Sequence, residues 1–597
     1  MCGIFGLTKK KSFEFINKFK NNLDKRGPDD FNFYVDDNIT LLHNRLSILD
    51  LTKGKQPMKF EDLVIIYNGE IFNSPNLRKS LIEKGYNFFT DNSDTEVILK
   101  LYHLKGSKML NDLNGMFSFV IYDQKKKKLF GAVDKHSIKP LYYTYKNNEF
   151  AFASEVRPLL KLENISKDIS KQNLNYYFNL QYSPSNLTMY EDIKKIENSS
   201  FFEFDIKNKK FEINKYTIEN KQNYFYNSYF DVIKAGQEAI EKSVENWMLS
   251  DVEVACSLSG GLDSSIIASI QAMKTNKKIK TISVGFENED FKYDETKYAN
   301  RVAKYIQSDH EEIKVNSNLL LDDLESIINY LAEPYAGSLA SWFIYKNLND
   351  KKVIFTGTGA DELFGNYGKW KLYSLSEIFF KNLLDAIIKQ DIKYIKNFYG
   401  FTYKKILYQK QVNKLIKSNV NNQIDISEII QKISSQNKNL NAKKRIQEID
   451  HNLQLPWEFL YITDRLSMMN SVEARTPYLD NEMLSFISKI KPKYYGNILN
   501  SKKILKDIAK KYIPEDIISR KKKGFTLPKD NWLRSKFKHL FKHYCSKEFI
   551  HNQNLFNLEE VDKIFIEFQK KPNNINTEKA WTLFIFQFWY EKNYSSY

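Results

Sequence analysis

The sequence predicts a two-domain protein of the α/β and α+β classes, with a β-rich N-terminal part followed by a larger α/β part. The chain has 597 residues, which is too long for a single hydrophobic core. Short β-rich runs alternate with Gly, Asn and Asp turns in the N-terminal part. From Tyr229 onward the pattern becomes helical, with strands followed by helices. These three observations define the fold class.

The N-terminal strands are expected where apolar runs are short and bounded by turns. A polar stretch rich in Asn and Lys, between about Ile193 and Tyr226, contains the expected domain boundary, and we divide the chain into residues 1–210 and 211–597. The run Lys125-Lys126-Lys127-Lys128 is expected to be a solvated hairpin. Strands are predicted over residues 117–123, 129–133 and 150–153.

Composition indicates a globular protein of a reducing compartment. Hydrophobic residues make up 42% of the chain and aromatic residues 15%, so burial is ample, and no apolar run is long enough to cross a bilayer. The first apolar stretch ends at Lys9-Lys10-Lys11, which does not resemble a signal peptide. Three cysteines provide no disulfide framework. We therefore expect a cytoplasmic protein.

The formal charge of +17 raises the question of a nucleic-acid partner. The lysines are spread over the whole chain, and their abundance beside Asn, Ile, Tyr and Phe is what an AT-rich genome would encode. The charge would still help to attract small anions. We expect small-molecule substrates and neither a nucleic-acid nor a membrane partner, and we allow for a homodimer.

The segment Met1-Cys2-Gly3-Ile4-Phe5-Gly6 is the most informative one. Removal of the initiator Met, which the small size of Cys favours, would leave Cys2 with a free α-amine. An α-amine titrates near pH 8 and a thiol near about 8.5, so the two groups can exchange a proton close to neutrality. This arrangement is typical of an N-terminal nucleophile. The alternative is a small apolar residue that happens to follow the start Met.

The following motifs carry a resemblance to a known family. In chain order they are Arg26-Gly27-Pro28-Asp29-Asp30, His43-Asn44-Arg45-Leu46-Ser47, Tyr67-Asn68-Gly69-Glu70, Ser93-Asp94-Thr95-Glu96 and Gly115-Met116-Phe117. With Cys2 they resemble the class II (Ntn-type) glutamine amidotransferases, specifically the glutamine-hydrolysing asparagine synthetase family. The resemblance implies an αββα Ntn-hydrolase sandwich, followed by a synthetase domain similar to the adenine-nucleotide α-hydrolases.

Hydrolysis of a glutamine side chain needs a nucleophile, oxyanion donors and a clamp on the amino-acid end. Cys2 would attack. We expect Asn68 and Gly69 on a sharp turn after the apolar run 63–67, where a side-chain amide and a backbone N–H could stabilise the oxyanion by roughly 3 kcal/mol each. Arg45 is suited to the α-carboxylate and Asp94 to the α-ammonium. The resemblance adds Glu70 to this glutamine-binding set. The alternatives are an ordinary Asn-Gly hairpin and solvated ion pairs.

A second site is predicted after a buried strand over 252–257. The motif Ser259-Gly260-Gly261-Leu262-Asp263-Ser264-Ser265 leads directly into a helical stretch, and such an arrangement directs backbone N–H groups and a helix dipole at a phosphate. It resembles the pyrophosphate loop of enzymes that transfer AMP. The resemblance implies an ATP site that also includes Leu258, Val284 of the strand 281–286, Thr356 and Gly357.

The second loop, Thr356-Gly357-Thr358-Gly359-Ala360-Asp361-Glu362, resembles the family's second phosphate and metal loop. Asp263 and Asp361 would hold Mg²⁺ against the pyrophosphate. The family's acidic residue between the loop glycines is Thr358 in this chain, and Thr cannot accept a proton comparably. The segment from Glu333 to Ser338 also matches its family pattern only loosely. Both differences weaken the prediction that aspartate is the acceptor, and neither affects the prediction of adenylation.

The C-terminal matches include Asp464 to Asn470, Glu473 to Asp480 and Arg520 to Phe525. Lys502 is our candidate for the lysine that neutralises phosphate charge, and Lys503 beside it leaves the register open. A solvated basic turn is the alternative for Arg520 to Lys523. From about residue 369 to 445 the sequence suggests only amphipathic helices.

The resemblance implies that glutamine is hydrolysed at Cys2 and that ammonia travels through a tunnel to an acyl-adenylate, with release of AMP and pyrophosphate. ATP and Mg²⁺ are the expected cofactors, and aspartate is the leading acceptor. A uronic acid of a surface polysaccharide is the rival acceptor, which Thr358 favours. A β-lactam-forming enzyme is disfavoured because the glutaminase motifs are intact. A non-catalytic binding protein is the alternative from another class.

Overall fold

The computed structural model describes residues 1–216, 225–286, 294–315, 318–348, 350–365, 406–421, 425–435, 442–495, 500–520 and 527–594. Much of the stretch 369–445 and residues 521–523 of the basic run therefore lie outside the described residues.

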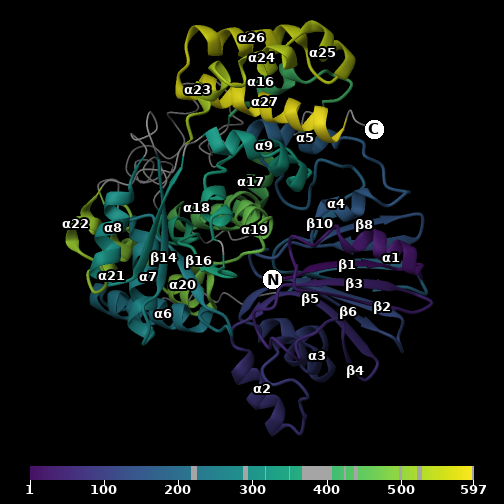
Figure 1. Ribbon diagram of the computed structural model, residues 1–597, viewed down its shortest axis with the longest axis vertical. Helices are drawn as coiled ribbons and strands as arrows, with labels where there is room; N and C mark the ends of the chain where they lie inside the picture. Colours follow the sequence, from purple (N-terminus) through teal and green to yellow (C-terminus); the bar gives the residue numbers. More distant parts are fainter. Residues whose placement is uncertain are drawn as a thin grey trace.

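The N-terminal part consists of two stacked antiparallel sheets, which confirms the predicted sandwich (Figure 1). The first has the order β10-β8-β9-β1-β3-β2 and the second β12-β11-β7-β6-β5-β4. The strands of the first are β1 (Gly3–Leu7), β2 (Asp30–Val35), β3 (Thr40–Arg45), β8 (Tyr142–Lys146), β9 (Glu149–Ala153) and β10 (Lys194–Lys195). Those of the second are β4 (Met58–Phe60), β5 (Leu63–Ile71), β6 (Gly115–Asp123), β7 (Lys128–Val133), β11 (Ser200–Asp205) and β12 (Lys210–Lys215).

Alternation along the strands separates three apolar layers. In β5, Val64 and Ile66 point to the core between the sheets, whereas Ile65 points to the outer helices. Helices α2 (Ser74–Glu83) and α3 (Asp94–Lys105) cover the second sheet, and α1 (Phe13–Lys20) and α4 (Val156–Leu160) cover the first (Figure 1). This is the αββα order that the resemblance implied.

Two local predictions have different outcomes. The Lys125 to Lys128 hairpin is confirmed, because β6 and β7 pair up to Asp123 and Lys128. The sharp turn at Asn68 and Gly69 is wrong, since β5 continues to Ile71 and pairs with β6 throughout. Gly69 is needed there because a Cβ would lie 2.2 Å from the carbonyl oxygen of Met116.

The boundary at residue 210 falls at the start of β12, which pairs with β11 along its whole length. We therefore propose that the junction between the halves follows Lys215.

The C-terminal part contains a parallel five-stranded sheet of order β15-β14-β13-β16-β17. Its strands are β13 (Val254–Ser257), β14 (Lys280–Phe286), β15 (Asp309–Val315), β16 (Val353–Phe355) and β17 (Glu473–Arg475). Around it lie α6 (Tyr229–Trp247), α7 (Leu262–Lys274), α8 (Thr296–Tyr305), α9 (Asn318–Leu331), α10 (Trp342–Lys346), α11 (Ala360–Phe364), α19 (Tyr461–Met468), α20 (Asn481–Ser488), α21 (Lys503–Ala509) and α22 (Glu515–Ser519). The predicted strands at 252–257 and 281–286 and the helix after the Ser-Gly-Gly loop are confirmed.

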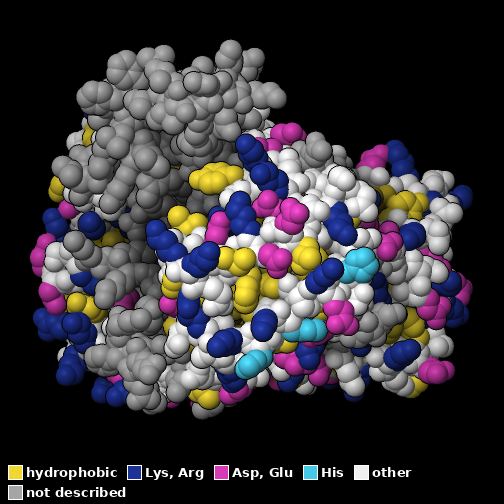
Figure 2. Space-filling view, turned by 90° about the horizontal axis from the view of Figure 1, so that it is seen from above, with side chains coloured by type: hydrophobic (Ala, Val, Ile, Leu, Met, Phe, Trp, Pro, Cys, Tyr) yellow, Lys and Arg dark blue, Asp and Glu magenta, His cyan; other side chains and the backbone are white. Residues whose placement is uncertain are grey.

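Further helices form a layer at the end of the molecule that includes the buried helix α27 (Figure 1). They are α16 (Gln409–Leu415), α23 (Lys529–Arg534), α24 (Lys538–Tyr544), α25 (Lys547–Gln553), α26 (Leu558–Lys570) and α27 (Asn574–Asn593), and α5 (Lys171–Leu180) joins them from the N-terminal half. Helices α17 (Ile426–Ser435) and α18 (Ala442–Ile449) lie outside this layer, near α19 (Figure 1). On the face in Figure 2, basic and acidic side chains lie intermixed. Within the described ranges, no helix combines the length and the apolar character that a membrane span needs.

Candidate active sites

Cys2 immediately precedes β1 and is almost fully buried. Its backbone N–H donates to Oδ1 of Asn68 over 2.9 Å. Burial raises the pKa of the Cys2 thiol, and three groups act against this: the positive α-ammonium of the chain start, the N–H of Leu46 and the charge of Arg45. The structure thus brings Cys2, Asn68 and Arg45 together, as expected.

Arg45 ends β3, and backbone carbonyl groups hold its guanidinium. Nη2 donates to the oxygens of Leu49 (3.2 Å) and Asp50 (2.6 Å), and Nη1 donates to that of Leu51 (3.2 Å). These carbonyls fix the orientation of the guanidinium. A carboxylate ligand would bind to donor positions that the carbonyls leave available.

Asp94 and Glu70 form the acidic side of this centre. Oδ2 of Asp94 accepts from Tyr67 Oη (2.8 Å) and from the N–H of Ile71 (2.9 Å). Burial raises the pKa of Asp94 to about 6. Burial, followed by the negative charges of Asp94 and Glu473, holds the pKa of Glu70 well above its usual range. Oε2 of Glu70 is buried and has no hydrogen-bond partner, so it is available to a cationic ligand.

The C-terminal half also contributes side chains to this centre, from the segment Glu473 to Asp480. Glu473 of β17 is fully buried, and its Oε2 lies 3.2 Å from the α-ammonium nitrogen of Met1. Its Oε1 pairs with Nε of Arg475 over 2.6 Å. The backbone oxygen of Arg475 accepts from the N–H of Thr356 (2.9 Å), so β17 contacts both predicted sites.

Arg26 is a second connection between the halves. Nε donates to the carbonyl oxygen of Cys2 over 3.1 Å, and the two terminal nitrogens bind both oxygens of Asp464 on α19 (2.9 and 3.1 Å). The Arg-Gly-Pro-Asp motif draws attention to Arg26 in the sequence. It does not indicate the partner of Arg26, because Asp464 lies 438 positions away in the chain.

The Ser-Gly-Gly loop connects the end of β13 to the start of α7. Oγ of Ser259 lies 2.9 Å from Oγ of Ser264, which closes the loop on itself. Gly260 has φ +68°, and a Cβ there would lie 2.4 Å from the N of Ala299. Gly261 caps α7, so the N–H groups of the first turn are available to an anion. Leu258 precedes the loop, and Val284 lies in the adjacent strand β14.

The second loop packs directly against the first. A Cβ on Gly357 would lie 3.0 Å from Cβ of Asp263 and from the N of Ser264. Gly359 has φ +94° and starts the short helix α11, whose first turn contains Asp361. Oγ1 of Thr358 accepts from Oγ1 of Thr356 over 3.1 Å. Thr356, Gly357, Asp361 and the first loop therefore form one surface.

Lys502 joins the two loops. Nζ lies 2.6 Å from Oδ1 of Asp263 and 2.6 Å from Oδ1 of Asp361. Burial would lower the pKa of Lys502, but the two carboxylates outweigh it and raise the pKa above its ordinary value. Lys503 points elsewhere, to Asp507. The geometry thus places Lys502, and not Lys503, at the predicted phosphate site.

A divalent cation fits this arrangement. Asp263 and Asp361 are two carboxylates from separate loops that converge on one point, which Lys502 Nζ occupies. Mg²⁺ usually takes one or two carboxylates and completes its shell with phosphate and water oxygens. Among the described residues no cluster of three or more metal-ligating side chains is found.

The segment from Glu333 to Ser338, which departs from the family pattern in sequence, is closely packed at Gly337. A Cβ on Gly337 would lie 2.3 Å from Oη of Tyr335, so that hydroxyl occupies the space of a side chain at 337. Glu333 is buried and accepts from Ser183 Oγ (3.1 Å) and the N–H of Met189 (2.9 Å). Arg520 donates to the carbonyl oxygen of Gly260 (2.8 Å) and pairs with Glu295.

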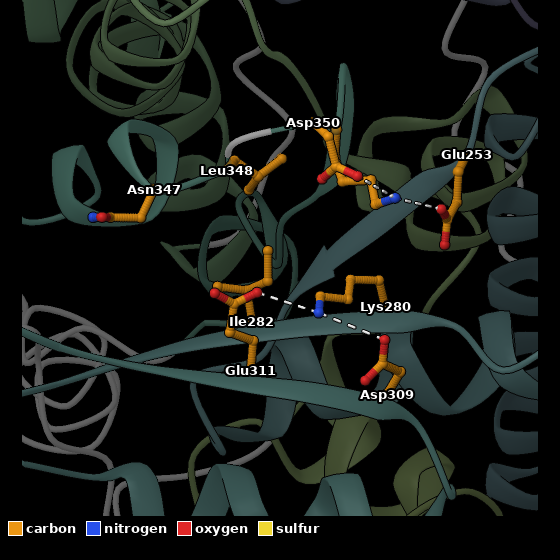
Figure 3. A pocket seen from close by; sticks show the side chains of 9 residues that line it. Glu253, Lys280, Ile282, Asp309, Glu311, Asn347, Leu348 and Asp350 are labelled. Atoms are coloured by element: carbon orange, nitrogen blue, oxygen red, sulfur yellow. Dashed lines mark hydrogen bonds and ion pairs between the residues drawn. The ribbon is translucent and has the colours of Figure 1, made fainter.

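A pocket of about 280 Å³ lies at the amino ends of the strands of the parallel sheet (Figure 3). Lys280 and Asp309 start β14 and β15, so this pocket is remote from the loops at the carboxyl ends of the strands. Lys280 is already paired with Asp309 (3.5 Å) and Glu311 (3.2 Å). We assign no role to it.

One chain thus combines an N-terminal thiol centre with a pair of glycine-containing loops in its other half, and the family matches define this chain as a glutamine-dependent ligase. Residues 235–591 match the family described as Asparagine synthase, and residues 1–217 match the Glutamine amidotransferase domain. The chain therefore belongs to the asparagine synthase family.

The similar curated proteins extend over most of the chain. Glutamine-hydrolyzing asparagine synthetase 1 of Bacillus subtilis strain 168 is 29% identical over 99% of this chain and 97% of its own length. Asparagine synthetase 3 of the same organism is 28% identical over 88% of this chain and 87% of its own. Asparagine synthetase B of Escherichia coli K12 is 26% identical over 88% and 82%.

Proposed function

We propose that the chain hydrolyses glutamine at Cys2 and uses the ammonia to amidate an acyl-adenylate made from ATP, with aspartate as the acceptor. The observation that carries this proposal is the contact of one strand, β17, with both centres: Glu473 reaches the N-terminal centre, and Arg475 binds the loop that starts at Thr356.

At the first centre the freed α-amine of Cys2 would take the thiol proton, because both groups titrate near neutrality in water. The N–H to Asn68 Oδ1 bond holds the amine in place. This leaves the Asn68 side-chain N–H₂ and the Gly69 N–H as proposed donors to the oxyanion. Arg45 would bind the α-carboxylate, and Asp94 with Glu70 the α-ammonium.

At the second centre the residues Leu258 to Gly261, Asp263, Ser264, Val284, Thr356 and Gly357 are proposed to bind ATP. Asp263 and Asp361 would hold Mg²⁺, which neutralises the leaving pyrophosphate when bound. Lys502, released from its two carboxylates, would move to the phosphates. The three cysteines are free, which supports the reducing, cytoplasmic compartment that we propose.

Aspartate is the leading acceptor because the similar proteins are named as asparagine synthetases. One observation favours the second candidate, a uronic acid of a surface polysaccharide. Thr358 and Gly337 both lack the acid of the family pattern, and Tyr335 Oη fills the space at Gly337.

The purified protein should be incubated with glutamine, Mg²⁺–ATP and aspartate, and asparagine, glutamate, AMP and pyrophosphate assayed by mass spectrometry. We expect asparagine in step with AMP. Cys2→Ala should lose the glutamine-dependent product and keep product formation from ammonium chloride. Glutamate without asparagine would direct the search to uronic acids, and ADP in place of AMP would refute the adenylation chemistry.

A further inference from the structure

A loop over residues 46–54 holds the guanidinium of Arg45, and its central contact is Asp50. The carbonyl oxygen of Asp50 accepts from Arg45 Nη2 (2.6 Å) and from the N–H of Gly54 (3.0 Å). Gly54 is packed so closely that a Cβ there would lie 2.6 Å from Arg45 Nη2. A shift of Asp50 would therefore displace the guanidinium.

Asp50 also joins this loop to the turn that precedes Asp94. Its Oδ2 accepts from the N–H groups of Asp91 (2.9 Å) and Asn92 (3.2 Å). The backbone of Asp50 lies in the left-handed region at φ 48°, which is costly for a residue with a Cβ and persists only where the surroundings hold it. The loop that orients Arg45 and the turn that leads into Asp94 thus share one anchoring residue.

The C-terminal half supplies a carboxylate that holds both segments. Asp251 lies between α6 and β13, and its Oδ2 accepts from the N–H of Asp50 over 2.7 Å. Its two carboxylate oxygens accept from Nδ2 of Asn92 over 3.1 and 3.2 Å. Its own N–H donates to the carbonyl oxygen of Ile48 over 3.0 Å. One residue of the other half therefore contacts the loop at two points and the turn at one.

Apolar packing fixes the position of these contacts. Ile48 belongs to a buried apolar cluster, and Val252 and Val254, which follow Asp251 in the chain, pack against that cluster. Asp251 itself is exposed, and an exposed pair of flexible charged side chains would contribute little. Here the partners are a backbone N–H and a short amide beside a packed interface, so the geometry is defined.

We infer that Asp251 is a positioning residue for glutamine, through which the C-terminal half completes the pocket of the N-terminal half. The inference rests on the proposed function, in which Arg45 binds the α-carboxylate of glutamine and Asp94 binds the α-ammonium. Asp251 acts through Asp50 and Asn92 and takes no part in bond cleavage. Its loss should therefore weaken glutamine binding and leave the cleavage step largely unchanged.

Asp251→Asn tests the inference through the KM for glutamine in glutamate formation. An amide offers one acceptor oxygen in place of two, so it cannot accept from both the Asp50 N–H and Asn92 Nδ2. We expect the KM to rise at least about fivefold with kcat within about twofold, as for lost substrate binding, and ammonium-dependent AMP formation to stay unchanged. Glu253→Gln is the matched control with the same change of charge, at an exposed side chain paired with Lys351 (Figure 3), and should leave the KM unchanged.

A swap variant separates positioning from general damage to the fold. Asp251→Asn/Asn92→Asp exchanges donor and acceptor, so the amide at position 251 can accept from the Asp50 N–H and donate to the carboxylate at position 92. The swap should restore the KM to within about twofold of wild type, whereas Asn92→Asp alone sets two carboxylates against each other and should raise it. A swap variant no better than Asp251→Asn would overturn the inference, as would an unchanged KM in Asp251→Asn.

Amide hydrogen exchange keeps this inference distinct from the proposed function. If the wild type forms no glutamate from glutamine, the proposed function fails, but the N–H of Asp50 still reports its contact with Asp251. In Asp251→Ala this amide should exchange at least about tenfold faster than in wild type, which would retain Asp251 as the residue that holds the loop. Exchange at the wild-type rate in Asp251→Ala would overturn the inference whatever the glutamine turnover.

Discussion

Arg26 donates a hydrogen bond of 3.1 Å from Nε to the carbonyl oxygen of Cys2, and its other two nitrogens bind both oxygens of Asp464. All three residues are buried. The proposed nucleophile of one half is therefore linked through Arg26 to a carboxylate of the other half. This contact to the carbonyl oxygen and the hydrogen bond from the Cys2 N–H to Asn68 Oδ1 hold the backbone of Cys2 on both sides.

Arg26→Met should lower the free energy of unfolding by about 3 kcal/mol, because the buried Asp464 loses its two short hydrogen bonds and keeps the longer 3.6 Å pair with Lys139. Glutaminase activity should fall more than ammonium-dependent activity. Urea unfolding and the two rates measure this. The double variant Arg26→Met/Asp464→Leu should recover part of the stability but not the glutaminase rate. Recovery of both would show that Arg26 acts only on stability.

Lys502→Met should reduce pyrophosphate–ATP exchange by at least about 100-fold, because the two loops would lose the cation that neutralises phosphate charge. The adjacent Lys503→Met is the matched control and should stay within about threefold, since Lys503 pairs with Asp507 on its own helix. The opposite order of the two effects would mean that the lysines exchange places when ATP binds.

The sequence predicted those parts of the sites that are local. The Ser259 to Ser264 loop was recognisable because strand, glycines and helix are contiguous. The sequence alone does not distinguish Lys502 from Lys503. The distinction depends on the backbone of Lys502, which has a left-handed conformation (φ 54°) at the start of α21, while its side chain reaches the two loops.

The dipeptide Asn68-Gly69 predicts a turn because it is a strong turn signal, whereas in the structure the glycine permits the close approach of β5 to β6. The roles of Arg26 and Glu473 depend on contacts between distant parts of the chain, for which the local sequence carries no signal. Longer-range pairing of this kind is decided by tertiary packing and not by local propensity.

Thr358→Val should keep both AMP and amide formation within about threefold of wild type. The Thr358 hydroxyl accepts a hydrogen bond from Thr356, and a hydroxyl without an adjacent base contributes little to proton transfer. Mass-spectrometric assay of AMP and of the amide product, with the carboxylate that the wild-type enzyme amidates, measures both rates. A loss of 30-fold or more in amide at unchanged pyrophosphate release would instead assign Thr358 to positioning ammonia at the adenylate.

Asp94 should give the glutaminase an acidic limb. Burial raises its pKa to about 6, and the α-ammonium of glutamine needs the ionised form, so kcat/KM should fall about tenfold per pH unit below pH 6. A carboxyl in the unfolded chain titrates near about 3.9. Between these values the folded state holds a proton that the unfolded state has lost, so this group's contribution to stability decreases as pH rises from about 4 to 6, by about 3 kcal/mol in total.

Asp94→Asn should therefore remove that decrease. The variant should be more stable than wild type at about pH 6.5, which is above the Asp94 pKa of about 6, and should show no such gain at about pH 4. It should also lose glutamine binding, because an amide cannot pair with an ammonium group as a carboxylate does. Urea unfolding at the two pH values measures the first effect. Asp112→Asn, at a half-exposed carboxyl paired with Lys105, is the control and should show no such difference. Equal stability changes at both pH values in Asp94→Asn would mean that Asp94 is ionised throughout, held by Tyr67 and Ile71 against the effect of burial.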